Sequence, residues 1–314
     1  MTLPLTEQGT IPQTSSKRTW VRARDLSTTF RGFMLSREVQ NCTPATLQTY
    51  ERRLIAFFQF LCKHECGDLK DITRTHIELY LRDFQLRNCS PFYVDAQYRS
   101  IKAYLRWCLA EQYITTDPLR NVHAPKLPRL CKPFLTPEQF QSLQALCPST
   151  CYWGARNAAI LCLLWSTGIR VHEAANIQLK DIEWGSAKRK SSILIYGKGQ
   201  KERHVPLLPK TKQALWRYLN FRSDDLPQLW LTEEGKPATK WMISSVLHKL
   251  EERAGLKLKD RCHIFRRSWA WEQIRAGVPE KYILLVGGWE SRAMLDRYIG
   301  AATSENAMQA NWKE

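Results

Sequence analysis

The chain has 314 residues and carries 47 Lys and Arg against 30 Asp and Glu, a formal net charge of +17 that both halves of the sequence share. Its 44% hydrophobic residues suffice for the cores of about two domains. The longest apolar run, Ala158 to Trp165, is too short to cross a membrane, and no secretion signal opens the sequence. The sequence excludes a membrane-spanning chain and predicts a cytoplasmic protein with a polyanionic partner.

The first domain is expected to be helical and to cover residues 23–114, after a polar tail of residues 1–22. Thr43-Pro44 and Ser90-Pro91 each place an N-cap residue before a proline, which favours the start of a helix. Apolar residues recur at helical spacing behind both starts. The expected helices run from about Leu26 to Val39, from Pro44 past Leu61, from Thr73 to Leu86 and from Pro91 past Cys108.

Residues 115–136 are rich in proline and in basic side chains. This composition predicts a stiff, extended connector between two domains, although an ordinary surface loop would have the same composition. The charged basic residues of this segment are Arg120, Lys126, Arg129 and Lys132.

The second domain is expected to cover residues 137–300 and to be mainly α with a small antiparallel β-sheet. Thr136 and Gln139 have the spacing of a capping box around Pro137. An apolar helix then ends at Gly168, and two alternating segments flank Gly197-Lys-Gly199 as paired strands would. The expected elements are helices at 153–166, 210–221 and 240–254 and strands at 192–196 and 203–207.

The stretch from His263 to Tyr298 carries chemically active side chains on helical segments that Gly287-Gly288 interrupts. On one unbroken helix, Trp289 and Tyr298, which are nine residues apart, would face opposite sides. With Ser291 as the N-cap of a new helix, Trp289 lies in a turn and Tyr298 on the helix. Both side chains can then face one pocket.

The ten cysteines are scattered, and several fall within helical apolar stripes, as reduced core residues do. Cys62, His64 and Cys66 have a spacing that zinc ligands can have, and so do Cys147 and Cys151. Neither group has a second Cys or His pair at the distance that a zinc finger requires. The sequence therefore predicts no metal site.

Four motifs follow one another along the second domain. They are Thr167-Gly-Ile-Arg-Val-His-Glu173, the segment from Tyr196 to Pro206 with Lys198, His263-x-x-Arg266, and Trp289 nine residues before Tyr298. This ordered set resembles the tyrosine site-specific recombinases of the phage integrase family, which includes Cre and the Xer proteins. Taken singly, His263, Glu173 and Trp289 would more often be structural. One departure is Gly287, where Leu is more usual in the family.

The resemblance implies a two-domain, C-shaped DNA clamp, in which a SAM-like helical core-binding domain precedes an integrase-type catalytic domain. It implies an enzyme that cleaves DNA through a 3′-phosphotyrosyl link and rejoins strands through a Holliday junction, with no metal, ATP or other cofactor. Such an enzyme would serve integration, resolution or the movement of a mobile element. The alternatives left open are a telomere resolvase, a strand transferase like type IB topoisomerases, and an inactive DNA-binding relative.

The resemblance also implies roles for individual residues. Tyr298 is the expected nucleophile, and Lys198 the expected general acid. The rest of the expected catalytic set is Arg170, His263, Arg266 and Trp289, with Glu173 in support. The residues expected to contact the DNA backbone are Lys126, Arg129, Lys132, Lys201, Arg203 and Arg267.

The partners that the resemblance implies are double-stranded recombination sites, further copies of the chain in a tetramer on DNA, and an accessory or directionality protein. Residues 301–314 are expected to contact a neighbouring protomer, because Met308 and Trp312 would share one face of a short helix. In the cell, the protein is expected in the cytoplasm with the nucleoid.

Overall fold

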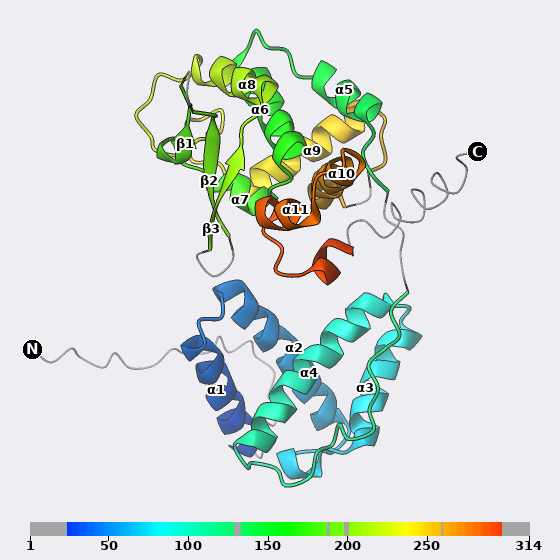
Figure 1. Ribbon diagram of the computed structural model, residues 1–314. Helices are drawn as coiled ribbons and strands as arrows, with labels where there is room; N and C mark the ends of the chain where they lie inside the picture. The colour runs from blue at the N-terminus through cyan, green and yellow to red at the C-terminus, as the bar shows by residue number, and fades with distance from the viewer. Residues whose placement is uncertain (1–23, 129–132, 187–188, 198–200, 259, 297–314) are drawn as a thin grey trace, which may run out of the picture. The chain divides into compact units, whose positions relative to one another are not determined.

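The computed structural model describes residues 24–128, 133–186, 189–197, 201–258 and 260–296. The chain divides into two compact units, Met1–Arg129 and Leu130–Glu314. Both are helical and the second also holds a small antiparallel sheet, so the expected mainly α fold with a small sheet is confirmed (Figure 1). Within the described ranges, none of the helices is both long and apolar enough to span a membrane.

The helices of the first unit begin where the sequence places capping residues. They are α1 (Arg24–Val39), α2 (Pro44–Lys63), α3 (Arg74–Leu86) and α4 (Pro91–Ala110), with the 3-10 helix η1 (Leu69–Asp71) between α2 and α3. The Thr43 side chain accepts a hydrogen bond from the Thr46 N–H, and the Ser90 side chain accepts one from the Tyr93 N–H. These bonds satisfy backbone donors that the first turn of a helix leaves unpaired. The expected helices of this unit are confirmed.

The core of the first unit is rich in aromatic side chains, and it extends beyond the helices. Tyr104 on α4 packs edge-on against Phe33 on α1, with 5.6 Å between the ring centroids. Leu119 and Val122, which the sequence placed in the connector, are buried in the same core. The Tyr98 hydroxyl donates to the Val122 carbonyl oxygen at 3.1 Å. The first part of the expected connector therefore packs on the first unit.

In the second unit, most residues of helix α6 (Tyr152–Thr167) are buried in the core. The other helices are α5 (Pro137–Ala145), α7 (Val171–Ala175), α8 (Pro209–Leu219), α9 (Lys240–Arg253), α10 (Arg261–Arg275) and α11 (Glu280–Gly287), with the 3-10 helix η2 (Leu179–Asp181). Helix α6 packs along α8 and also contacts α10 (Figure 1). The expected helices at 153–166, 210–221 and 240–254 are confirmed, and so is the capping box of Thr136 and Gln139.

A three-stranded antiparallel sheet lies beside α7 and α11 (Figure 1). Its strands are β1 (Ile182–Glu183), β2 (Ser192–Tyr196) and β3 (Glu202–Pro206), in the order β1-β2-β3. Ile193 pairs with Val205, and both side chains are buried in the core of the second unit. The expected hairpin is confirmed. Strand β1 was not predicted, because two residues are too few to show an alternating pattern.

The chain enters the second unit along α10. The Leu135 N–H donates to Oγ of Ser268 at 2.7 Å, and the Phe134 ring stacks on Trp271 with 5.4 Å between centroids. Nε of Arg267 donates to the Pro133 carbonyl oxygen at 3.3 Å. The last part of the expected connector, residues 133–136, therefore packs on the second unit.

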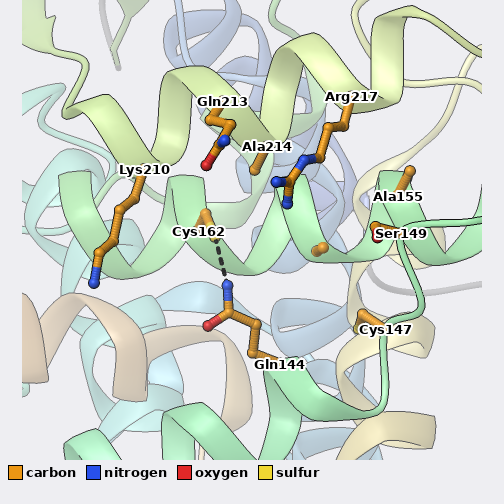
Figure 2. A pocket seen from close by; sticks show the side chains of 10 residues that line it. Gln144, Cys147, Ser149, Ala155, Cys162, Lys210, Gln213, Ala214 and Arg217 are labelled. Carbon is orange, nitrogen blue, oxygen red and sulfur yellow. Dashed lines mark hydrogen bonds between the residues drawn. The ribbon is translucent and has the colours of Figure 1, made fainter.

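A cavity of about 370 Å³ lies between α5, α6 and α8 (Figure 2). Gln144 donates to Sγ of Cys162 at its centre, and Lys210 and Arg217 approach it from α8. None of the predicted site residues that the structure describes lines this cavity. The expected site is instead built on α7, β3, α10 and the turn after α11.

Candidate active site

Arg170 is placed by the turn that ends α6. Gly168 adopts the left-handed conformation, with φ of 60°, and a Cβ there would lie 2.5 Å from the Trp269 ring. Only glycine satisfies both the conformation and the close approach. Arg170 follows as the N-cap of α7, and its side chain is 22% exposed. The turn therefore leaves this guanidinium partly exposed.

Glu173 holds the Arg170 side chain in place through hydrogen bonds. Its Oε1 accepts from Nη1 of Arg170 at 2.8 Å, and its Oε2 accepts from the Arg170 N–H at 2.9 Å. Arg203 donates to the same carboxylate at 2.7 and 3.2 Å. The Glu173 side chain has no exposed surface. A carboxylate in this position orients its neighbours and does not reach a substrate.

The carboxyl group of Glu173 stays ionised across the physiological range. Burial opposes its ionisation, but hydrogen bonds from Arg203 and from the Arg170 N–H outweigh burial and lower its pKa to about 2. Because this folded-state pKa lies below the ordinary value of 4.5, the contribution to stability is complete above pH 4.5. It is lost only as the pH falls toward 2.

Arg203 lies in the interior, and its side chain is 8% exposed. Beyond Glu173, its Nε donates to the Val286 carbonyl oxygen at 2.8 Å. This placement does not favour the backbone contact with DNA that the sequence suggested. Lys201, two residues earlier on the same hairpin, forms an ion pair with Glu290 at 2.7 Å. Because its side chain is 70% exposed, it remains accessible to a phosphate.

Arg266 joins the turns that precede Arg170 and Trp289. It has no exposed surface, and its Nη1 donates to the Gly168 carbonyl oxygen at 2.8 Å. Its Nη2 donates to the carbonyl oxygen of Gly287. The Trp289 ring centroid lies 4.0 Å from Cζ of Arg266, which is a cation–π distance. Arg266 thus contacts the Trp289 ring and the turn that leads to Arg170.

Two glycines with different tasks set the position of Trp289. Gly288 ends α11 with φ of 64°, and the Trp289 N–H donates to the Leu284 carbonyl oxygen at 2.9 Å. A Cβ on Gly287 would lie 2.2 Å from the Trp289 ring. Gly287 therefore admits the large ring, which explains why a Leu is absent here. Residues 292–296 form a new helical turn after Ser291, as predicted.

The Gly287→Ala variant should be destabilised, because its methyl group overlaps the Trp289 ring. Overpacking of this kind costs about 1–3 kcal/mol. In a Trp289→His background the same change should cost less, since an imidazole is smaller than an indole. Denaturant unfolding of the four proteins measures this coupling. Gly67→Ala is the control, because Gly67, like Gly287, does not have a positive φ, and a Cβ there would meet nothing within 4 Å. Equal costs of Gly287→Ala in both backgrounds would contradict the proposed overlap.

His263 and Arg267 are one turn apart near the start of α10 but differ in exposure. His263 is exposed in the first turn of the helix. Arg267 is 2% exposed, and its Nη1 lies 3.1 Å from Oδ2 of Asp260. A guanidinium held this way lies inside the fold, so the placement does not favour the expected contact with DNA.

Several expected site residues lie outside the described residues. They are Lys198, Tyr298, Arg129 and Lys132. Lys126 is described and is exposed. No cluster of three or more His, Cys, Asp and Glu with the geometry of a metal site occurs in the described part of the chain.

The sequence did not identify the interior role of Arg203. One signal for it was present, since Arg203 and Val205 are two residues apart on β3 and so share a face of the sheet. Val205 is fully buried. A basic residue on the inward face has to find a carboxylate, and Glu173 is that partner.

The chain is similar to known proteins in sequence and in fold. A model of the phage integrase family matches residues 133–305. The chain is similar to the tyrosine recombinase XerC of Anoxybacillus flavithermus, with 28% identity over 246 residues, which is 76% of this chain and 81% of the relative. It is also similar to XerC of Oceanobacillus iheyensis, with 27% identity over 267 residues, or 82% and 86% of the two chains.

Several solved structures share the fold, including two that are similar over most of this chain. A lambda integrase dimer bound to a COC′ core site has a TM-score of 0.71 at 17% identity, covering 87% of this chain and 94% of that one. The XerH site-specific recombinase bound to a palindromic difH substrate has a TM-score of 0.73 at 18% identity, covering 92% and 85%.

Proposed function

Because the chain belongs to the phage integrase family, we propose that it is a DNA strand transferase that recombines specific sites, with Tyr298 as the nucleophile. The reaction class is that of a tyrosine recombinase. The observation that carries the proposal is the convergence of Arg170, Arg266 and Trp289 through the carbonyl groups of Gly168 and Gly287. Arg266 thereby links parts of three separate motifs within the fold, which supports the proposal.

The two arginines supply the charge that the transition state needs. Attack on a phosphodiester adds negative charge to the non-bridging oxygens, and preorganised donors aimed at that charge are often the largest catalytic contribution. Guanidinium groups are planar and permanently charged, so they suit two phosphate oxygens. Arg170 is accessible as it stands. A phosphate reaches Arg266 only after side chains around it, including the Trp289 ring, move aside.

The remaining roles concern protons. A phenol has a pKa near ~10, so Tyr298 needs a proton acceptor to attack at neutral pH, and the exposed His263 serves as that acceptor. The departing 5′-oxygen needs a proton, and Lys198 donates it. Trp289 can only donate through its indole N–H, so it stabilises a phosphate oxygen and transfers no proton.

Exposed basic residues hold the DNA. Lys126 and Lys201 are both exposed, and neutralising phosphates releases counterions and strengthens binding. Arg129 and Lys132 extend this contact along the connector. The proposal also includes strand exchange through a Holliday junction and a tetramer on DNA whose protomers are joined by residues 301–314. The recombinase would act in the movement of a mobile element.

Covalent joints between protein and DNA test the proposal. The wild-type protein is incubated with nicked suicide substrates drawn from the DNA that flanks its gene, and SDS-stable adducts are mapped. Adducts at discrete positions, with a free 5′-hydroxyl and recombinant products between two such sites, are expected. Absence of adducts across that DNA would contradict the proposal. Relaxation of plasmids that lack any such site would favour the topoisomerase alternative.

A further inference from the structure

Arg203 is not among the residues proposed above to act on DNA. We infer that it is a positioning residue for strand cleavage. Its side chain connects Glu173, the carboxylate that holds Arg170, to the turn that carries Trp289. The inference rests on the proposed function, since its effect is measured on the cleavage rate. It concerns three elements that are far apart in the sequence: α7, β3 and the end of α11.

One side of the Arg203 guanidinium holds Glu173. The two pairs are Nη2 to Oε2 at 2.7 Å and Nη1 to Oε1 at 3.2 Å, a bidentate arrangement. Oε1 also accepts from Nη1 of Arg170 at 2.8 Å. One buried carboxylate is therefore shared by an interior arginine and an accessible one. The position of Arg203 thus decides where Glu173, and through it Arg170, can lie.

The other side of Arg203 holds the end of α11. Its Nε donates to the Val286 carbonyl oxygen at 2.8 Å. A Cβ on Gly288 would lie 3.0 Å from Cζ of Arg203, so the guanidinium packs directly on this turn. Trp289 follows immediately, and the Gly287 carbonyl oxygen accepts from Arg266. The same side chain therefore supports the turn that sets Trp289 and borders Arg266.

Only arginine can make this set of contacts. Its planar group offers donors in three directions, and here Nε, Nη1 and Nη2 are each used. A lysine ammonium is a single point that cannot bind both Glu173 oxygens and the Val286 carbonyl in this geometry. The Arg203→Lys variant should therefore keep the charge and the fold but lose the link between the two sides.

Removal of Arg203 should also change how the reaction responds to pH. The charged and titratable groups around Glu173 are Arg170 at the start of α7, Arg203 on β3 and the neighbouring His172. Without Arg203, burial acts against a carboxylate that keeps only Arg170, so the pKa of Glu173 rises from about 2. The protonated form holds Arg170 less firmly, and cleavage should fail progressively as the pH is lowered.

The experiment measures single-turnover cleavage of a suicide substrate at saturating protein, alongside DNA affinity and thermal unfolding. Arg203→Met should slow cleavage by about 10²-fold, the scale expected for misplaced groups, with DNA affinity unchanged. Arg203→Lys should also be slow while unfolding like the wild type. The cleavage rate of Arg203→Met, divided by the wild-type cleavage rate at the same pH, should fall as the pH is lowered from 8 to about 5. The reason is that Glu173 becomes protonated over this range only in the variant.

A matched control and a double variant complete the experiment. Arg189→Met removes an equal charge from a side chain that is 75% exposed, and it should cleave at the wild-type rate. Once Glu173→Gln has removed the carboxylate, adding Arg203→Met should cost little more. A fully additive loss, or an Arg203→Lys variant that folds and cleaves normally, would overturn the inference. Failure of the wild-type protein to form adducts would instead overturn the proposed function.

Discussion

Replacement of Tyr298 by Phe should abolish SDS-stable adducts between protein and DNA while leaving DNA binding intact. The change removes one oxygen atom, and the proposed reaction forms its covalent bond through that atom. Gel shifts measure binding, and denaturing gels with labelled suicide substrates measure the adduct. The ring remains, so any packing that Tyr298 provides is preserved.

Tyr282 supplies the control for this prediction. It lies on α11, 51% exposed, and it lacks the spacing from Trp289 that the motif requires. Tyr282→Phe should form adducts at the wild-type rate. If Tyr298→Phe still forms adducts, or if Tyr282→Phe does not, the nucleophile has been misassigned.

The second large effect is expected at Lys198. Loss of a general acid typically slows a reaction by 10²–10⁴-fold, so the Lys198→Ala variant should cleave about that much more slowly. The cause is the 5′-oxygen, which leaves poorly unless it is protonated. A substrate with sulfur at the 5′-bridging position leaves as a thiolate without that proton. It should therefore restore most of the cleavage rate of Lys198→Ala.

Lys201→Ala provides the contrast, because it removes another lysine from the same hairpin. Its loss should weaken DNA binding, and the sulfur substrate should not change its rate relative to the wild type. Single-turnover rates on oxygen and sulfur substrates measure both effects. A Lys198→Ala variant that sulfur does not rescue would assign Lys198 to another task, such as holding the DNA backbone.

Local signals in the sequence predicted most of the fold. Thr43, Ser90 and Thr136 start helices because each offers an oxygen to unpaired backbone N–H groups, and a proline follows each of them. Gly168 and Gly288 end helices with positive φ. Such signals act over a few residues, so a single sequence reveals them.

The contacts that hold the site together were not predictable in the same way. Glu173 and Arg203 form a buried ion pair although they are 30 residues apart in the sequence. The sequence alone does not indicate which of its many Arg side chains points into the core. Arginine is usually exposed, which favoured a DNA contact for Arg203 and Arg267. In the structure both side chains are instead buried beside a carboxylate partner. Long-range pairing of charges depends on the finished fold.

The attachment of residues 133–135 to α10 governs how this protein can be dissected. A catalytic fragment that began at Pro137, where the sequence places the domain boundary, would lack the Phe134 ring that stacks on Trp271. It would also lose two hydrogen bonds: the one that the Leu135 N–H donates to Ser268, and the one that Arg267 donates to the Pro133 carbonyl oxygen. Those gaps would open on the helix that bears His263 and Arg266. An intact fragment has to begin at or before Pro133, which is also where the family match begins.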